Sequence, residues 1–275
     1  MKLKNLSLQP SVLAAELVGT FLLTTVALVT QGNLLIVGFT MLVLALAIGA
    51  VSGAHVNPAV TFGLWSARKL ETLKVPFYWA MQFAGALLAL LLVQWFKGGH
   101  FGLALDINHF DPRLVVAEIA GTAAFTFAIG AAVQHKLNDG TKAVAIGLGL
   151  LVGIAVGGGL IGQAAQSSDL LKNAKSNETP RVAQVDGATL NPAIALASAE
   201  KDSQSSLQSL MGEEKEQTTK TPASRFTWES IIGTLAGGAI GVNLAVALSG
   251  VNPFKVDKKA AVKAKVTKVF KKGKK

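Results

Sequence analysis

Residues 53–59 read Gly-Ala-His-Val-Asn-Pro-Ala, and residues 187–193 read Gly-Ala-Thr-Leu-Asn-Pro-Ala. Each stretch leads into a short apolar segment, at about 57–66 and about 191–199. Neither segment can cross a bilayer alone, because a spanning helix takes roughly 20 apolar residues. Two matched, short apolar segments that each begin at Asn-Pro therefore predict a pair of half-helices.

A second pair of matched motifs opens each half of the chain. Residues 15–20 read Ala-Glu-Leu-Val-Gly-Thr, and residues 117–122 read Ala-Glu-Ile-Ala-Gly-Thr. Each motif stands in a long apolar segment and is followed by two more such segments, with the Asn-Pro-Ala stretch before the last of them. The two halves of the chain therefore form an internal repeat.

The composition is that of a membrane protein. Hydrophobic residues make up 51% of the chain and charged residues 15%, whereas a soluble domain carries about 25% charged residues. The mean hydropathy is +0.46. Six segments are long and apolar enough to span a bilayer, at about 11–30, 34–51, 76–96, 113–134, 142–163 and 228–249. The sequence thus predicts an all-α membrane protein with six transmembrane helices and two half-helices.

The number of spans in each repeat sets their relative orientation. Three spans is an odd number, so the second repeat lies upside down in the membrane, as in inverted-repeat channels and transporters. We expect a first repeat at 1–110, a second at 111–250 and a basic tail at 251–275. The extra length of the second repeat lies in two polar insertions, 164–186 and 200–226.

The basic residues predict the orientation in the membrane. Most of the 26 lysine and arginine residues fall on the side that carries both termini. The positive-inside rule therefore places both termini in the cytoplasm, with the protein in the cell membrane. The tail from Lys255 onward is rich in lysine, which favours contact with anionic lipid headgroups. A solvated tail remains an alternative, and nucleic-acid binding is the less favoured one.

The half-helices have a direct physical consequence. Pro58 and Pro192 stand at the first turn, where no backbone donor is lost. The free N–H groups and positive dipole ends then point toward the bilayer centre. Irregular backbone at that depth is tolerated only where it is buried or lines a wet cavity. The pair therefore predicts a pore, with the side-chain amides of Asn57 and Asn191 as donors to passing water and the dipole ends opposing cations.

With Asn57-Pro58-Ala59 and Asn191-Pro192-Ala193 in six spans, the chain resembles the aquaporin and glycerol-facilitator (major intrinsic protein) family. The resemblance covers about residues 11–250, apart from the two insertions. It implies an aquaporin-like fold and a passive channel for water or small uncharged solutes such as glycerol. It also implies a homotetramer in membrane lipid, and it implies no cofactor.

The second motif departs from the family pattern. The family usually has Arg directly after the second Asn-Pro-Ala, where this chain has Ile194. Alignment places the other three positions of the selectivity filter at Val37, Ile154 and Ala188, which are also apolar. An apolar constriction cannot replace the hydrogen bonds of water. We expect either a wider pore that passes small uncharged solutes such as glycerol, or a pore that passes water with weaker discrimination against other solutes. Arg181 could fold back as a substitute, but we expect it to be a solvated loop charge.

Two carboxylates stand inside apolar spans, where an unpaired ionisable group is costly. The resemblance implies that Glu16 and Glu118 are structural acceptors for backbone N–H groups of the half-helix loops, and His55 is interpreted as support for the first loop. An ion- or proton-coupled transporter that uses both glutamates remains an alternative. A third possibility is a structural membrane protein whose pore the apolar ring closes.

Catalysis and metal binding are not expected. The chain has no cysteine, and its four histidines show no spacing typical of metal ligands. No nucleophile and base are paired in the sequence, so we predict that the protein is not an enzyme. In the fifth span, Gly149, Gly153 and Gly157 recur every four residues on one face, which favours close helix packing.

Overall fold

The structure is a computed structural model that describes residues 9–99, 101–105, 110–135, 137–167, 180–201 and 223–250. Within this part of the chain, six helices are long and apolar enough to cross a membrane. They are α1 (Pro10–Val29), α2 (Leu34–Ser52), α4 (Val75–Phe96), α5 (Pro112–Gln134), α6 (Asp139–Ala165) and α10 (Trp228–Leu248). The predicted all-α membrane fold is confirmed, and the predicted tail 251–275 lies outside the described residues.

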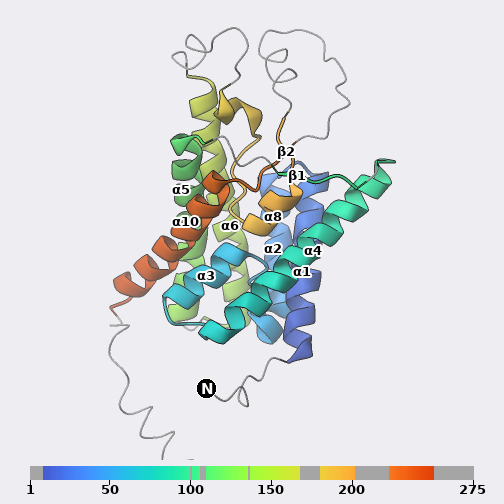
Figure 1. The fold of residues 1–275 in the computed structure, drawn as a ribbon. Helices are drawn as coiled ribbons and strands as arrows, with labels where there is room; N and C mark the ends of the chain where they lie inside the picture. The colour runs from blue at the N-terminus through green and yellow to red at the C-terminus, as the bar shows by residue number, and fades with distance from the viewer. Residues whose placement is uncertain are drawn as a thin grey trace, which may run out of the picture.

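Two short helices occupy the places where half-helices were predicted. They are α3 (Pro58–Ser66) and α8 (Pro192–Ala197). Each begins because an asparagine caps it: Asn57 Oδ1 accepts from the Ala59 N–H at 2.7 Å, and Asn191 Oδ1 accepts from the Ala193 N–H at 3.0 Å. An Asn cap followed by Pro is a favourable helix start. Figure 1 shows the two half-helices between the long helices.

The half-helices interlock the two halves of the bundle. α1 packs against α2 and α4, whereas α5 packs against α6 and α10. Each half-helix crosses to the other group, because α3 packs on α10 and α8 packs on α4. The halves also meet along α2 and α6. Neither half therefore completes its packing without the other.

One end of the bundle carries a small sheet, and we call it the β end (Figure 1). There β1 (Ala104–Leu105) pairs in parallel with β2 (Ala223–Ser224), with Ala104 beside Ala223 and Leu105 beside Ser224. The 3-10 helix η3 (Arg181–Gln184) lies against α6, and a second, η2 (Thr72–Lys74), leads into α4. The described parts of both insertions therefore pack on the helices.

Close contact between α5 and α6 depends on glycine. A Cβ atom added at Gly153 would lie 2.7 Å from the Gly121 carbonyl oxygen and 2.9 Å from Phe125 Cβ. A Cβ atom added at Gly157 would lie 2.6 Å from Ala188 Cβ. The small residues thus let the helix backbones approach each other and the loop before α8.

We expect Gly153→Ala to destabilise the protein by about 1–3 kcal/mol, because the new methyl group has no room against backbone atoms. The matched control is Gly159→Ala in the same helix, where an added Cβ would meet no atom within 4 Å. The control should be neutral or slightly stabilising, since Ala favours helix over Gly by about 1 kcal/mol. Thermal unfolding in detergent compares the two. Equal midpoints would show that close packing at Gly153 does not matter.

Candidate pore and selectivity filter

The tips of the two half-helices are tied directly to each other. Asn57 Nδ2 donates to the Leu190 carbonyl at 2.8 Å, and Asn191 Nδ2 donates to the Val56 carbonyl at 3.0 Å. Each asparagine thus binds the residue that precedes the other, although the two lie far apart in the sequence. These reciprocal bonds fix the two tips at the centre of the bundle.

The residues before the two asparagines adopt an uncommon backbone conformation. Val56 has a φ of 42° and Leu190 a φ of 54°, a left-handed region that β-branched and bulky residues rarely occupy. Their carbonyls accept from the asparagines, while their N–H groups donate to glutamates. Val56 N–H donates to Glu16 Oε2 at 2.7 Å, and Leu190 N–H donates to Glu118 Oε2 at 2.9 Å. These bonds on both sides hold the strained geometry in place.

Glu16 is fully buried and receives four hydrogen bonds. Its Oε1 accepts from Ser52 Oγ at 2.6 Å and from the His55 N–H at 3.0 Å. Its Oε2 accepts from the Val56 N–H at 2.7 Å and from Gln82 Nε2 at 2.8 Å. Hydrogen bonds of this number lower the cost of burying a carboxylate. This geometry is the one that a structural acceptor requires.

Glu118 occupies the equivalent place in the second half. Its Oε1 accepts from the Thr189 N–H at 2.8 Å and from Thr189 Oγ1 at 2.9 Å, and its Oε2 accepts from Leu190. Arg225 Nη2 lies 3.8 Å from Glu118 Oε1. Glu16 therefore has a neutral glutamine partner, whereas Glu118 has a cation beside it.

His55 contacts the first half-helix. Its Nδ1 lies 3.1 Å from Thr61 Oγ1 in α3, and its ring lies 4.8 Å from the ring of Tyr78 in α4. Tyr78 in turn donates to the Ser52 carbonyl at 2.8 Å. The imidazole therefore bridges the loop to α3 and α4, in the position that loop support requires.

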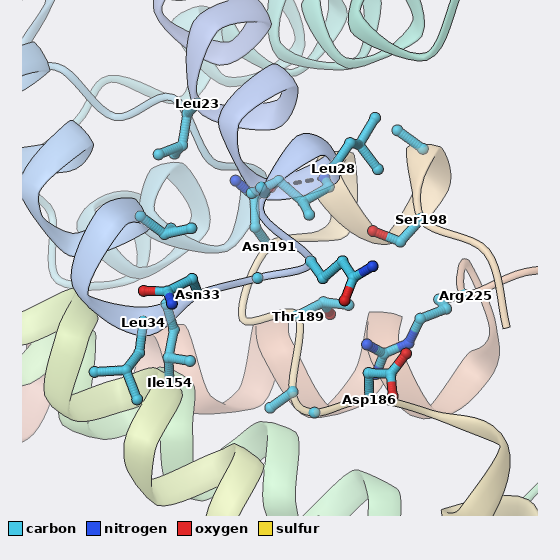
Figure 2. A pocket seen from close by; sticks show the side chains of 18 of the residues that line it. Leu23, Leu28, Asn33, Leu34, Ile154, Asp186, Thr189, Asn191, Ser198 and Arg225 are labelled. Atoms are coloured by element: carbon cyan, nitrogen blue, oxygen red, sulfur yellow. Dashed lines mark hydrogen bonds between the residues drawn. The ribbon is translucent and has the colours of Figure 1, made fainter. Parts of the chain in front are cut away.

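A cavity of about 890 Å³ begins at the two asparagines and extends toward the β end. All four predicted filter positions, Val37, Ile154, Ala188 and Ile194, line it together with Asn57 and Asn191. Met41, Phe125 and Leu150 add further apolar wall. The structure thus brings the sequence-predicted pore residues together around one space, which Figure 2 shows in part.

The cavity wall also contains polar side chains that were not predicted from the sequence. Thr189, Asp186, Ser198 and Arg225 line it toward the β end. Figure 2 shows Arg225 and Asp186 close to each other and on the same side as Thr189. Ordinary sequence signals could not mark Arg225, because it lies at the end of a polar insertion with no motif around it. Gln82 was discoverable, since an amide inside an apolar span usually has a partner.

The prediction that Arg181 is a solvated loop charge is wrong. Its side chain is only 10% exposed, and it makes a bidentate ion pair with Glu200, at 2.6 Å and 2.5 Å. Its Nε also donates to Glu229 Oε1 at 3.2 Å. Burial raises the pKa of Glu200, and the charge of Arg181 opposes that rise. Arg181 is therefore part of a buried ion-pair network at the start of α10, and it is not among the residues that line the cavity.

Metal ligation has no support in the part of the chain that the structure describes. No group of three or more His, Asp or Glu side chains gathers there in a way that could hold a metal ion. The cavity is lined by side chains that can donate hydrogen bonds, from Asn57, Asn191, Thr189 and Arg225, and the positive ends of the half-helices lie at the two asparagines.

The sequence profile described as "Major intrinsic protein" matches residues 6–168. Aquaporin Z from Photorhabdus laumondii is 30% identical over 168 residues, which cover 51% of this chain and 73% of that protein. The probable aquaporin TIP3-2 from Oryza sativa is 32% identical over 143 residues, covering 49% and 54%. The chain therefore belongs to the major intrinsic protein family and is a multi-pass membrane protein.

A solved structure supports the same fold. The aquaglyceroporin from Plasmodium falciparum matches with a TM-score of 0.51 at 20% identity, covering 87% of this chain and 95% of that one. The matches to the rice relatives TIP3-2 and PIP 1-3 span a little over half of their length, 54% and 57%. The likeness of fold thus covers more of the chain than the likeness of sequence.

Proposed function

We propose that the protein is a passive channel for water and small uncharged solutes such as glycerol in the cell membrane, with both termini in the cytoplasm. The observation that carries the proposal is the tied pair of half-helix tips, Asn57 and Asn191, at the wall of an 890 Å³ cavity. Irregular backbone inside a membrane bundle is tolerated where it is buried in protein or lines a water-filled cavity, and both asparagines line this cavity.

The amide groups explain how water would pass. Each asparagine amide carries two N–H donors, and one of them is engaged with the carbonyl across the tip contact. The second donor remains for a solute in the cavity. A water that gives its oxygen to both Asn57 and Asn191 would point its hydrogens away, toward neighbouring waters. The two positive helix ends would raise the barrier for cations at the same point.

The lining favours small neutral solutes over charged ones. The side chains of Val37, Ile154, Ala188 and Ile194 offer no hydrogen bonds, so the carbon chain of a solute such as glycerol would lie against them while its hydroxyl groups face Thr189. We place the two inverted repeats at 1–110 and 111–250, followed by a basic cytoplasmic tail at 251–275. Assembly as a homotetramer is part of the same proposal.

The test is stopped-flow light scattering on proteoliposomes that contain the purified chain. Water and glycerol permeability should both exceed those of empty liposomes, with no dependence on a proton gradient. Permeabilities equal to empty liposomes would refute the channel and favour a closed structural protein. A pH-sensitive dye inside the same vesicles addresses the coupled transporter, because acidification during solute entry would support proton movement through Glu16 and Glu118.

The filter position after the second motif offers a sharper prediction. We expect Ile194→Arg to lower the ratio of glycerol to water permeability by about tenfold, because a larger, charged side chain narrows the cavity that Ile194 lines. Ile194→Val is the matched control, since it keeps the wall apolar and should leave the ratio nearly unchanged. The two permeabilities are measured on the same vesicles. An unchanged ratio in Ile194→Arg would remove Ile194 from the constriction.

A further inference from the structure

The segment that carries Arg225 is fixed to the second half-helix. Ser224 Oγ donates to the carbonyls of Ala195 and Leu196 in α8, at 3.2 Å and 2.8 Å. The Arg225 N–H donates to the Ser198 carbonyl at 2.9 Å. The backbone of Arg225 is therefore hydrogen-bonded to the end of α8, and these bonds set the direction in which its side chain leaves the backbone.

The Arg225 side chain extends into the protein and reaches the cavity. It is only 13% exposed, and Nη2 lies 3.8 Å from Glu118 Oε1. It lines the same space as Ile194, Ala188 and Thr189. Figure 2 shows the guanidinium close to Asp186 and on the same side as Thr189. A buried cation thus lines the same cavity as the apolar positions of the predicted filter.

The other charged groups around the cavity are the exposed Lys97 and two carboxylates, Asp186 and Glu118, that have partners besides Arg225. Asp186 is 61% exposed and forms an ion pair with Lys201. Lys97 lines the cavity from the exposed end of α4. Glu118 already accepts three hydrogen bonds from the loop before α8. Arg225 is therefore the buried fixed positive charge among the described residues that line this cavity.

We propose that Arg225 is a specificity-determining residue of the pore, whose guanidinium repels cations at the constriction and donates hydrogen bonds to uncharged solutes. This inference rests on the proposed channel function. The ring of Val37, Ile154, Ala188 and Ile194 can supply neither effect, because it carries no charge and no donor. Arg225 would supply both from a different element, the segment between β2 and α10.

The physical basis is the field of a fixed charge in a narrow space. A cleft with low-dielectric walls that is lined by one sign of charge raises the local concentration of counter-ions by about tenfold to a thousandfold, and the same field repels ions of like charge. Burial lowers the pKa of the Arg225 guanidinium, and the carboxylates of Glu118, Glu200 and Asp186 oppose that shift. A guanidinium stays charged at neutral pH in proteins and presents five N–H donors. The distance of 3.8 Å between Arg225 Nη2 and Glu118 Oε1 is longer than a hydrogen bond.

A purely structural role as counter-ion to Glu118 is the competing explanation. The equivalent carboxylate, Glu16, is held with a neutral partner, Gln82, at 2.8 Å. A cation is therefore not required to hold a carboxylate at this place in the fold. The two halves of the bundle differ at this point, because Glu16 pairs with Gln82 whereas Glu118 lies beside Arg225, which lines the cavity.

The test uses Arg225→Gln in proteoliposomes, with ammonium as the probe because it is a cation of about the size of water. A voltage-sensitive dye reports ammonium entry, and neutral ammonia is silent in this measurement. We expect ammonium conductance to rise by about tenfold or more, while water permeability stays within about twofold. Arg113→Gln is the matched control, since Arg113 lies at the same end, is 48% exposed and pairs with Asp111 outside the cavity. It should behave as the wild type.

The outcomes separate the two proposals. A folded Arg225→Gln that passes water and excludes ammonium as the wild type does would overturn the filter role. A wild type that passes neither water nor glycerol would instead refute the channel. If Arg225→Gln does not fold, Arg225→Lys decides, because it keeps the charge beside Glu118 but loses the planar set of donors. Ammonium should stay excluded while the glycerol-to-water ratio shifts by about twofold or more, and an unchanged ratio would overturn the proposal.

Discussion

We expect Glu16→Gln to lower the midpoint of thermal unfolding in detergent by about 5–10 °C, which corresponds to roughly 3 kcal/mol for a chain of this size. The carboxylate accepts from four donors, and two of them are the backbone N–H groups of His55 and Val56. An amide has one oxygen, so its NH2 group must face one of these two N–H groups. That buried donor loses its acceptor and opposes another donor.

The matched control is Glu71→Gln, because Glu71 is a surface carboxylate whose side chain is 68% exposed and whose partner Lys74 lies 3.4 Å away. Surface substitutions of this kind change stability by about 0.5 kcal/mol or less. Equal midpoints for the two variants would contradict the structural role of Glu16. A Glu16→Gln protein of normal stability that loses only proton-coupled solute entry would favour the transporter.

The architecture followed from features that are visible in a single sequence. Span length, hydropathy and the Asn-Pro starts located the six long helices and the two half-helices to within a few residues. These signals are local, so they do not depend on knowing which residues meet. The position of Val37 on the cavity also followed by direct alignment from Asn57, with no insertion between them.

The parts of the site that the sequence did not predict depend on long-range contacts. Glu118 meets Arg225 across more than a hundred positions, through a polar insertion with no periodic pattern. Arg181 was predicted to be solvated because it stands in that kind of segment, yet Glu200 and Glu229 bury it. Each pairing needs the folded bundle to bring three segments together, which composition and spacing do not encode.

The arrangement at the β end also gives the insertions a structural place. Arg181, Glu200 and Glu229 link η3, the segment after α8 and the start of α10 through buried ion pairs. The Asp111 N–H donates to Glu229 Oε1 at 3.1 Å, which adds the start of α5. The segment that positions Arg225 is therefore supported from both sides.

The second prediction with a large expected effect concerns a reagent that blocks the cavity beside the contact between the two half-helix tips. The chain contains no cysteine, so a single introduced thiol is the sole target for a mercurial reagent. Ile194→Cys places a smaller side chain at a position that lines the cavity next to Asn191. The variant should conduct water before treatment, and a bound mercury atom should then obstruct the path. Val43→Cys is the control, because Val43 is 59% exposed on the outside of α2.

The most direct measurement is therefore the osmotic water permeability of Ile194→Cys proteoliposomes before and after mercuric chloride. We predict a fall to the level of empty liposomes that a reducing thiol reverses, with no change in the Val43→Cys control. Full labelling of Ile194→Cys, confirmed by mass, with undiminished water permeability would contradict a water path beside the joined half-helix tips.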